Sequence, residues 1–169
     1  MTPPETLRVR RRVIEVATRS PGETQSLAAA LAAAARPADR LALIGPLGAG
    51  KTQFAKGFAR GLGVEAVVNS PSFTLMAEYQ GRLPLFHQDL YRLAGTGEVL
   101  EGGLLDERQN AGVTLSEWAE RLDTDLDPMR LEVRIGLVGD DERRIELVAP
   151  ESPADAYEGY LLAAKAWRP

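Results

Sequence analysis

Residues 41–52 read LALIGPLGAGKT, an apolar run followed directly by a glycine-rich loop. The loop GPLGAGKT, from Gly45 to Thr52, satisfies the pattern G-x-x-x-x-G-K-[ST], which indicates a P-loop when a strand precedes it and a helix follows. Residues 41–44 are continuously apolar, as in a central parallel strand with helices on both faces. Residues 52–62 carry apolar side chains at helical spacing. The stretch therefore predicts a strand, a phosphate-binding loop and a helix in succession.

The residue types in this loop suit Mg-ATP. Glycines let backbone N–H groups converge on phosphate oxygens, and the helix that follows adds the positive end of its dipole. Lys51 is expected to act catalytically on the β- and γ-phosphates, and the Thr52 hydroxyl to be a magnesium ligand. ATP and Mg²⁺ are thus the predicted cofactors. The predicted nucleotide-binding residues of the loop are Leu47, Gly48, Ala49, Gly50, Lys51 and Thr52.

A P-loop enzyme also needs an acid at the end of a neighbouring strand, which holds the metal or orients water. Asp89 follows apolar residues in LPLFHQDLYRL, and Glu117 follows others in GVTLSEW. Both are expected at the carboxyl edge of an open α/β sheet, where ligands collect. We assign both a catalytic role and place Glu117 nearer the metal; a helix-capping or surface role is the alternative. His87, the only histidine, and Trp118 are expected to be core residues rather than groups that transfer protons or contact adenine.

The composition excludes several classes of protein. The 169 residues are 44% hydrophobic and 26% charged, typical of a soluble domain, and contain no cysteine for disulfides, zinc or thiolate catalysis. A net charge of -4 argues against an electrostatic clamp on nucleic acid. The arginines at positions 8 and 10–12 are interpreted as a solvated strand edge, with an RNA contact as the alternative. No apolar stretch resembles a signal peptide or spans a bilayer, so a cytoplasmic protein with no membrane partner is expected.

The remaining pattern predicts the fold class. Further helices are expected at residues 20–36 and 153–167, and residues 139–141 are typical of a hairpin turn. The prediction is one α/β domain over residues 1–169, with 1–12 and 151–169 as peripheral or extended ends. It is a P-loop NTPase-type three-layer domain with a mainly parallel central sheet and a C-terminal β-hairpin. Further strands are expected at residues 9–17, 67–69, 73–79, 83–86, 112–115, 131–138 and 144–148.

Several separated segments together resemble one family, the bacterial TsaE (YjeE) ATPase subunit of tRNA threonylcarbamoyladenosine (t6A) biosynthesis. Within residues 20–148 and in family order, they are SPGET, the P-loop with its helix, NSPSFTL, HQDLYRL, LSEW and GDDERRIEL. Pro46 departs from the family, which commonly has aspartate there. Proline removes one backbone hydrogen-bond donor at the start of the loop. We therefore expect it to change the affinity for the nucleotide rather than the family assignment.

The resemblance implies a magnesium site near Thr52 and Glu117, and it matches Asp89 to the family's H-x-D-x-Y-R motif. It places Thr24 near the base of the nucleotide and makes residues 70–74 a switch-like loop near the γ-phosphate. It also implies that ATP hydrolysis, weak in the chain alone, drives the cycle of a t6A transferase subunit and its dimerising partner (TsaD-TsaB type). Contact with tRNA is then mainly indirect, through that complex.

Three other functions share the P-loop. A small-molecule kinase needs a substrate pocket and a cationic lid. The sequence has no compact arginine-rich lid, although Arg143 and Arg144 can approach from the hairpin. A regulatory GTPase is disfavoured because nothing resembles the N-K-x-D segment that reads guanine. A non-enzymatic, nucleotide-dependent assembly module stays open, since binding and hydrolysis use overlapping residues.

Overall fold

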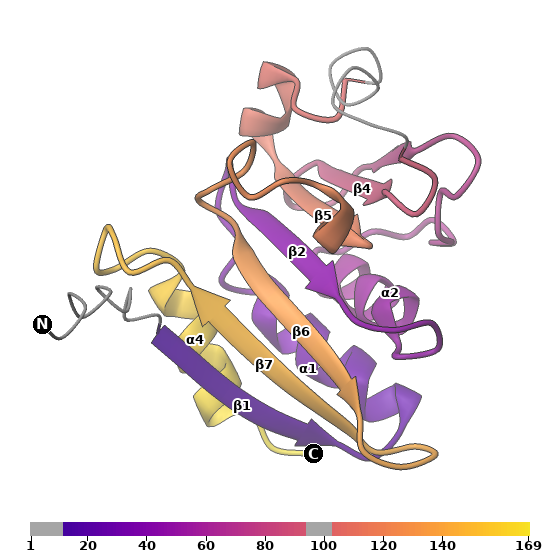
Figure 1. The fold of residues 1–169 in the computed structure, drawn as a ribbon, viewed down its shortest axis with the longest axis vertical. Helices are drawn as coiled ribbons and strands as arrows, with labels where there is room; N and C mark the ends of the chain where they lie inside the picture. The colour runs from indigo at the N-terminus through magenta and orange to yellow at the C-terminus, as the bar shows by residue number, and fades with distance from the viewer. Residues whose placement is uncertain (1–11, 94–102) are drawn as a thin grey trace, which may run out of the picture.

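The centre of the protein is a seven-stranded mixed sheet with the strand order β1-β7-β6-β2-β5-β4-β3 (Figure 1). The computed structural model describes residues 12–93 and 103–169. The central strands β6, β2, β5 and β4 run parallel, whereas β1–β7, β7–β6 and β3–β4 pair antiparallel. The predicted α/β class and β-hairpin are confirmed, with parallel pairing confined to the centre. The strands are β1 Arg12–Thr18, β2 Arg40–Ile44, β3 Met76–Tyr79, β4 Leu85–Asp89, β5 Val113–Glu117, β6 Leu131–Leu137 and β7 Arg143–Ala149.

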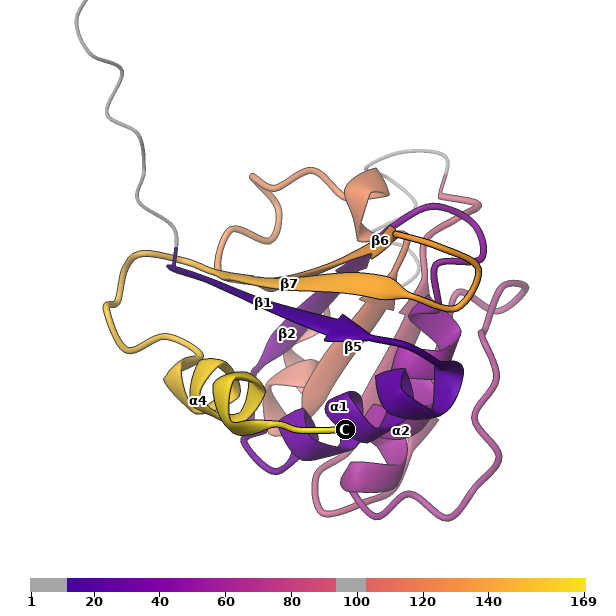
Figure 2. The same ribbon diagram turned by 90° about the horizontal axis from the view of Figure 1, so that it is seen from below.

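The α-helices of the described residues lie on one face of this sheet, as Figure 2 shows. They are α1 Pro21–Ala32, α2 Lys51–Gly61 and α4 Glu158–Ala166, and α1 contacts both of the others. The helix α1 begins where the Ser20 hydroxyl accepts a hydrogen bond from the backbone N–H of Glu23. The main core fills the space between helices and sheet. Its largest members include Leu27, Leu31, Leu41, Leu43, Phe54 and Phe58.

Glycine brings α2 close to α1 and so fixes where the P-loop helix lies. A Cβ atom at Gly61 would stand 2.5 Å from the carbonyl oxygen of Ala29, and one at Gly57 would collide with the backbone of Gln25. Any larger residue at these two positions would push the helices apart, because the obstruction is backbone rather than a flexible side chain.

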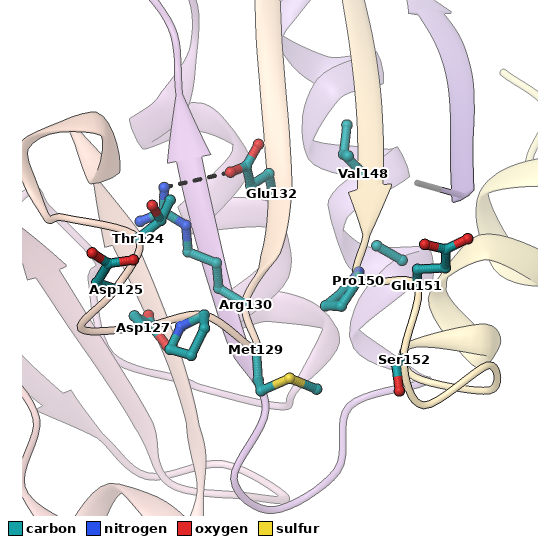
Figure 3. Close-up of a pocket in the computed structure, with 12 residues that line it drawn as sticks. Thr124, Asp125, Asp127, Met129, Arg130, Glu132, Val148, Pro150, Glu151 and Ser152 are labelled. Atoms are coloured by element: carbon teal, nitrogen blue, oxygen red, sulfur yellow. Dashed lines mark hydrogen bonds and ion pairs between the residues drawn. The ribbon is translucent and has the colours of Figure 1, made fainter. Parts of the chain in front are cut away.

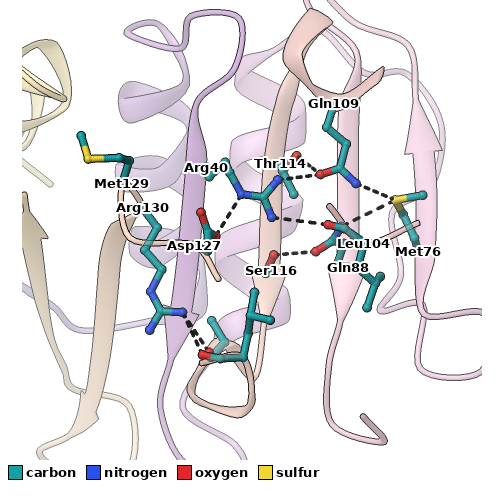
Figure 4. Close-up of polar contacts among 12 residues, drawn as sticks. Arg40, Met76, Gln88, Leu104, Gln109, Thr114, Ser116, Asp127, Met129 and Arg130 are labelled. Atoms are coloured by element: carbon teal, nitrogen blue, oxygen red, sulfur yellow. Dashed lines mark hydrogen bonds and ion pairs between the residues drawn. The ribbon is translucent and has the colours of Figure 1, made fainter. Parts of the chain in front are cut away.

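A polar layer covers the opposite face of the central strands (Figure 4). The Arg40 guanidinium lies 2.9 Å from Asp127 and donates to the side-chain oxygen of Gln109 at 2.6 Å. In the neighbouring strands, Ser116 donates to Gln88 at 2.9 Å, and Gln88 donates to the backbone of Leu104. These contacts attach the segments around two short 3-10 helices, η1 Glu107–Ala111 and η2 Ala119–Arg121, to the sheet.

On the polar side of the sheet, within residues 12–93 and 103–169, the short helix η2 contacts β2. The predicted strand at residues 67–69 is wrong. Val67 is 81% exposed, and the paired strand β3 begins only at Met76. Apolar β-branched residues favour a strand, but an isolated pair without a ladder partner does not form one.

The C-terminal helix and the first described residue of the chain both contact the rest of the domain. The helix α4 buries Tyr160, Leu161 and Ala164 in the main core. Arg12 starts β1 and forms an ion pair of 2.6 Å with Glu158 at the start of α4. The other three arginines of the basic cluster lie outside the described residues. Across the described ranges, no helix has the length and apolar character needed to cross a membrane.

The ion pair of Arg40 and Asp127 is expected to be important for stability. Only 18% of the Arg40 side chain and 9% of the Asp127 side chain are exposed, so removal of either partner leaves a largely buried charge. We expect Arg40→Ala to lower the free energy of unfolding by about 2–3 kcal/mol, measured by urea denaturation. The control is Arg108→Ala in the more exposed pair with Glu78, expected to cost less than about 0.5 kcal/mol. Equal decreases in the free energy of unfolding for the two variants would show that the Arg40–Asp127 pair is no more important for stability than an exposed pair.

Candidate functional site

The register of the parallel strands places two acids beside the glycine-rich loop. Glu117, the last residue of β5, lies opposite Leu43 of β2, one residue from the end of that strand. Asp89, the last residue of β4, lies opposite Glu117. Because side chains alternate along a strand, His87 and Asp89 share the face that carries the helices. The expectation that both acids lie at the carboxyl edge of the sheet agrees with this arrangement.

The loop between β2 and α2 takes a conformation that requires glycine. Gly48 and Gly50 have φ values of 79° and 106°, in the left-handed region that other residues rarely adopt. At the start of the loop, a Cβ atom at Gly45 would stand 2.5 Å from the carbonyl oxygen of Ile135. The helix α2 then begins at Lys51 without a side-chain cap. Its first N–H groups are therefore available to an anion.

A cavity of about 390 Å³ opens between this loop and the two acids. It brings together all the predicted site residues except Thr24. Thr24 lies in an adjoining hollow on the other side of Gly48–Gly50, where its hydroxyl is 2.8 Å from that of Thr18. The residues that line the larger cavity are Leu47, Gly48, Ala49, Gly50, Lys51, Thr52, Gln53, Ser70, Ser72, Asp89, Glu117 and Trp118.

Glu117 is held between two partners at the base of this cavity. The Thr52 hydroxyl donates to one carboxylate oxygen at 2.8 Å, and Nε2 of His87 lies 2.6 Å from the other. The His87 side chain is fully buried and that of Glu117 is 3% exposed. His87 thus has the polar core role that the sequence indicated, and that role is to orient the carboxylate of Glu117.

Asp89 holds the segment that precedes β3. One carboxylate oxygen accepts hydrogen bonds from the hydroxyls of Ser70 and Ser72, at 2.5 and 3.0 Å. The other oxygen accepts from the backbone N–H of Tyr91 at 2.9 Å. Thr74 is exposed and donates to the backbone of Met76, so it does not line the cavity. The segment 70–74 is therefore tied to the site through its serines.

Lys51 reaches back over the loop that precedes it. Its ammonium donates to the carbonyl oxygens of Gly45 and Pro46, at 2.5 and 3.0 Å, and lies 3.7 Å from the centre of the Trp118 ring. Burial lowers the pKa of the Lys51 ammonium, and the nearby carboxylates oppose this shift. Trp118 was expected in the core. It is half-buried, with a φ of 56°, and covers the lysine as a cation–π partner.

A second hollow, of about 410 Å³, lies at the other end of β6 and β7 (Figure 3). Acidic and apolar side chains such as Asp125, Glu151 and Met129 surround it. Arg130 also lines it, but its guanidinium contacts Glu132 and the backbone of η2. The hollow has neither a glycine loop nor a helix start, so the cavity beside the P-loop is the better candidate for a phosphate ligand.

Comparison with known proteins identifies the family. The profile of the family described as "Threonylcarbamoyl adenosine biosynthesis protein TsaE" matches residues 18–145. The chain belongs to the TsaE family. A TsaE of Bacillus subtilis is 48% identical over 133 residues, which cover 78% of this chain and 83% of that relative. A TsaE of Haemophilus influenzae is 39% identical over 109 residues, covering 63% and 68% of the two chains. Both are named tRNA threonylcarbamoyladenosine biosynthesis proteins.

A solved structure extends the likeness to the fold. The crystal structure of YdiB from Bacillus subtilis superposes with a TM-score of 0.74 at 39% identity, and covers 92% of this chain and 96% of YdiB. The P-loop NTPase-like fold predicted from the sequence is thereby confirmed for this TsaE-family chain.

One contact at the site was missed by sequence reasoning. Arg143, considered only as part of a possible kinase lid, donates instead to the backbone carbonyls of Gly48 and Ala49. The sequence shows Arg143 in the GDDERRIEL segment, but it does not show which way the side chain points. That direction follows from the strand alternation in β7, which turns Arg143 toward the loop and Arg144 to the other face.

The bonds of Asp89 give a test that needs no ligand. We expect Asp89→Asn to loosen residues 70–74. A neutral amide offers one acceptor oxygen for the bonds that two carboxylate oxygens now accept from Ser70, Ser72 and the N–H of Tyr91. Hydrogen–deuterium exchange of peptides covering residues 66–75 should become faster than in the parent protein. Asp125→Asn, at an exposed acid outside this cavity, is the control and should leave that exchange unchanged. Unchanged exchange in Asp89→Asn would show that Asp89 does not hold residues 70–74 in place.

Proposed function

We propose that this TsaE-family protein binds Mg-ATP in the P-loop cavity and hydrolyses it to support t6A modification of tRNA. The observation that carries the proposal is the meeting of Lys51, Thr52, Glu117 and Asp89 in one cavity beside a glycine-rich loop. The names of the relatives support a role in t6A biosynthesis, and the glycine-rich loop supports the binding of a nucleotide.

Phosphate binding rests on the backbone of the loop and on Lys51. The free N–H groups at the start of α2 and the positive end of its dipole favour the anionic phosphates. The Lys51 ammonium exchanges two neutral carbonyl acceptors for charged phosphate oxygens, which form stronger hydrogen bonds. Thr24, in the adjoining hollow, is proposed to border the base side of the nucleotide.

The donor set fits magnesium. The hydroxyl of Thr52 and the carboxylate of Glu117 are oxygen ligands 2.8 Å apart, and Mg²⁺ prefers oxygen and takes its remaining ligands from phosphates and water. Bound there, Mg²⁺ would neutralise phosphate charge. His87 keeps the carboxylate of Glu117 directed at this position.

Asp89 is proposed to orient the attacking water and to couple hydrolysis to the neighbouring loop. Its carboxylate stands beside Glu117 in the register and holds Ser70 and Ser72. When a nucleotide carries a γ-phosphate, its charge competes for these hydroxyls and shifts residues 70–74. Hydrolysis then returns the loop to Asp89.

The two arginines of the hairpin favour an ATPase over a small-molecule kinase. Arg143 donates to backbone carbonyls on the outer side of the loop, and Arg144 forms an ion pair of 2.7 Å with Glu15 on the exposed face. Within residues 12–93 and 103–169, neither arginine forms the cationic lid over the phosphates that a kinase needs.

The proposed partners are the t6A transferase subunit and its dimerising partner protein, with tRNA met mainly through that complex in the cytoplasm. Two large apolar side chains stand exposed near the cavity. Leu47, at the tip of the P-loop, is 84% exposed, and Phe73, next to Ser72, is 85% exposed. A partner that covers both would sense residues 70–74 directly.

The role of Lys51 is tested by nucleotide titration. We expect Lys51→Ala to weaken Mg-ATP binding by about 10- to 100-fold, because charge-assisted hydrogen bonds to phosphate are lost. Isothermal titration calorimetry measures this. Lys56→Ala, on the same helix but outside the cavity, should bind like the parent. Tight binding by Lys51→Ala would refute the proposed phosphate site.

The function itself is tested by phosphate release from the chain alone, from the transferase pair alone and from their mixture. We expect the mixture to exceed the sum of its components. Thr74→Ala should lower this stimulated rate more than it weakens nucleotide binding, because residues 70–74 form the proposed coupling loop. Thr124→Ala, at an exposed threonine outside the P-loop cavity, is the control. A mixture no faster than the sum, with complex formation confirmed, would exclude partner-driven hydrolysis.

A further inference from the structure

Arg143 connects two parts of the chain that are far apart in sequence. From the start of β7, its Nε donates to the carbonyl oxygen of Ala49 at 2.9 Å, and one terminal nitrogen donates to that of Gly48 at 3.2 Å. The other terminal nitrogen donates to the carbonyls of Gly139, Asp140 and Glu142, at 3.1, 3.1 and 2.9 Å. One planar guanidinium thus joins the P-loop to the turn between β6 and β7.

The same hairpin meets the P-loop at a second point. Gly45, the first residue of the loop, packs so closely on β6 that a Cβ atom would stand 2.5 Å from the carbonyl oxygen of Ile135. The loop is therefore fixed to the hairpin by close packing at its start and by Arg143 at its middle.

The contact with Ala49 also sets the direction of a phosphate-binding group. In a planar trans peptide the C=O and the N–H point in opposite directions. Since the carbonyl of Ala49 is held by Arg143, the N–H of the same peptide unit, on Gly50, points away from the arginine. Gly48 and Gly50 adopt left-handed φ values, and glycine can adopt many other backbone conformations as well. An external contact is therefore needed to hold the loop in one conformation.

We infer that Arg143 is a positioning residue: it clips the β6–β7 turn to the P-loop and keeps the loop amides in the arrangement that receives phosphate. It acts on the backbone carbonyls of the loop. It does not line the cavity that contains Lys51, and it borders the adjoining hollow together with Thr24. The effect on ATP rests on the proposed function, whereas the effect on the loop does not. Arg144 is a built-in control, because it is the next residue, has the same side chain and faces away, toward Glu15.

The experiment compares Arg143→Ala, Arg143→Lys and Arg144→Ala with the parent protein. Hydrogen–deuterium exchange of peptides covering residues 45–54 is measured without nucleotide. Binding of Mg-ATP and of magnesium tripolyphosphate, which lacks a base, is measured by calorimetry. We expect both Arg143 variants to exchange faster in this loop and to bind both ligands at least about tenfold more weakly, by the same factor. Arg144→Ala should match the parent in both assays.

Arg143→Lys separates a clip from a point charge. An ammonium lacks the planar fork that reaches both segments, so we expect it to stay within about threefold of Arg143→Ala. Parent-like binding in Arg143→Lys would show action by charge and overturn the inference. So would a loss of ATP binding with tripolyphosphate binding intact, which would place Arg143 at the base. Faster exchange spread over the whole chain would indicate only a general stabilising role and would also overturn it.

The two proposals fail in distinguishable ways. If the parent protein binds no Mg-ATP, the proposed function fails, and the exchange comparison still decides whether Arg143 holds the loop. If the parent binds Mg-ATP and the Arg143 variants keep its loop exchange and affinity, the clip fails and the function stands.

Discussion

The site depends on the register in which β2, β5 and β4 run parallel. This pairing sets Leu43 beside Glu117 and Glu117 beside Asp89, so the loop and both acids end at one edge of the sheet. A shift of one residue in β5 would turn Glu117 to the polar face that Ser116 now occupies. The glycines of α2 also determine the position of the site. They allow α2, the helix that follows the P-loop, to pack closely against α1.

The functional side chains all have hydrogen-bond partners within the protein. Lys51 donates to the carbonyls of its own loop, Thr52 donates to Glu117, and Asp89 accepts from two serines. None is left as a buried charge without a partner, which would cost several kcal/mol. A nucleotide bound as we propose would replace these contacts. Such an exchange is how we propose that phosphate changes the position of the segment 70–74.

Local patterns predicted most elements, and long-range contacts account for what they missed. The continuous apolar run at residues 41–44 and the helical spacing after Thr52 fixed β2 and α2, because burial imposes those patterns. The strand expected at residues 67–69 does not form, because a strand needs a pairing partner and the local sequence does not show whether one is present. The layer around η1 and η2 was likewise invisible, since it rests on side-chain bonds from Arg40 to residues as distant as Asp127. Motifs placed the acids and brought Thr52 near Glu117, but they did not predict the contact of His87 with Glu117.

Two kinds of contact hold the site, and they serve different ends. Arg143 and the packing of Gly45 on Ile135 act on the backbone of the loop, and neither Arg143 nor Gly45 lines the cavity. The bonds of Lys51 and Asp89 lie inside the cavity, where a phosphate bound as we propose would compete with them. The first kind lowers the conformational entropy that binding would otherwise have to remove from a glycine-rich loop. The second kind supplies the contacts that we propose to change when a nucleotide binds, so the proposed function places a fixed loop next to a segment that moves.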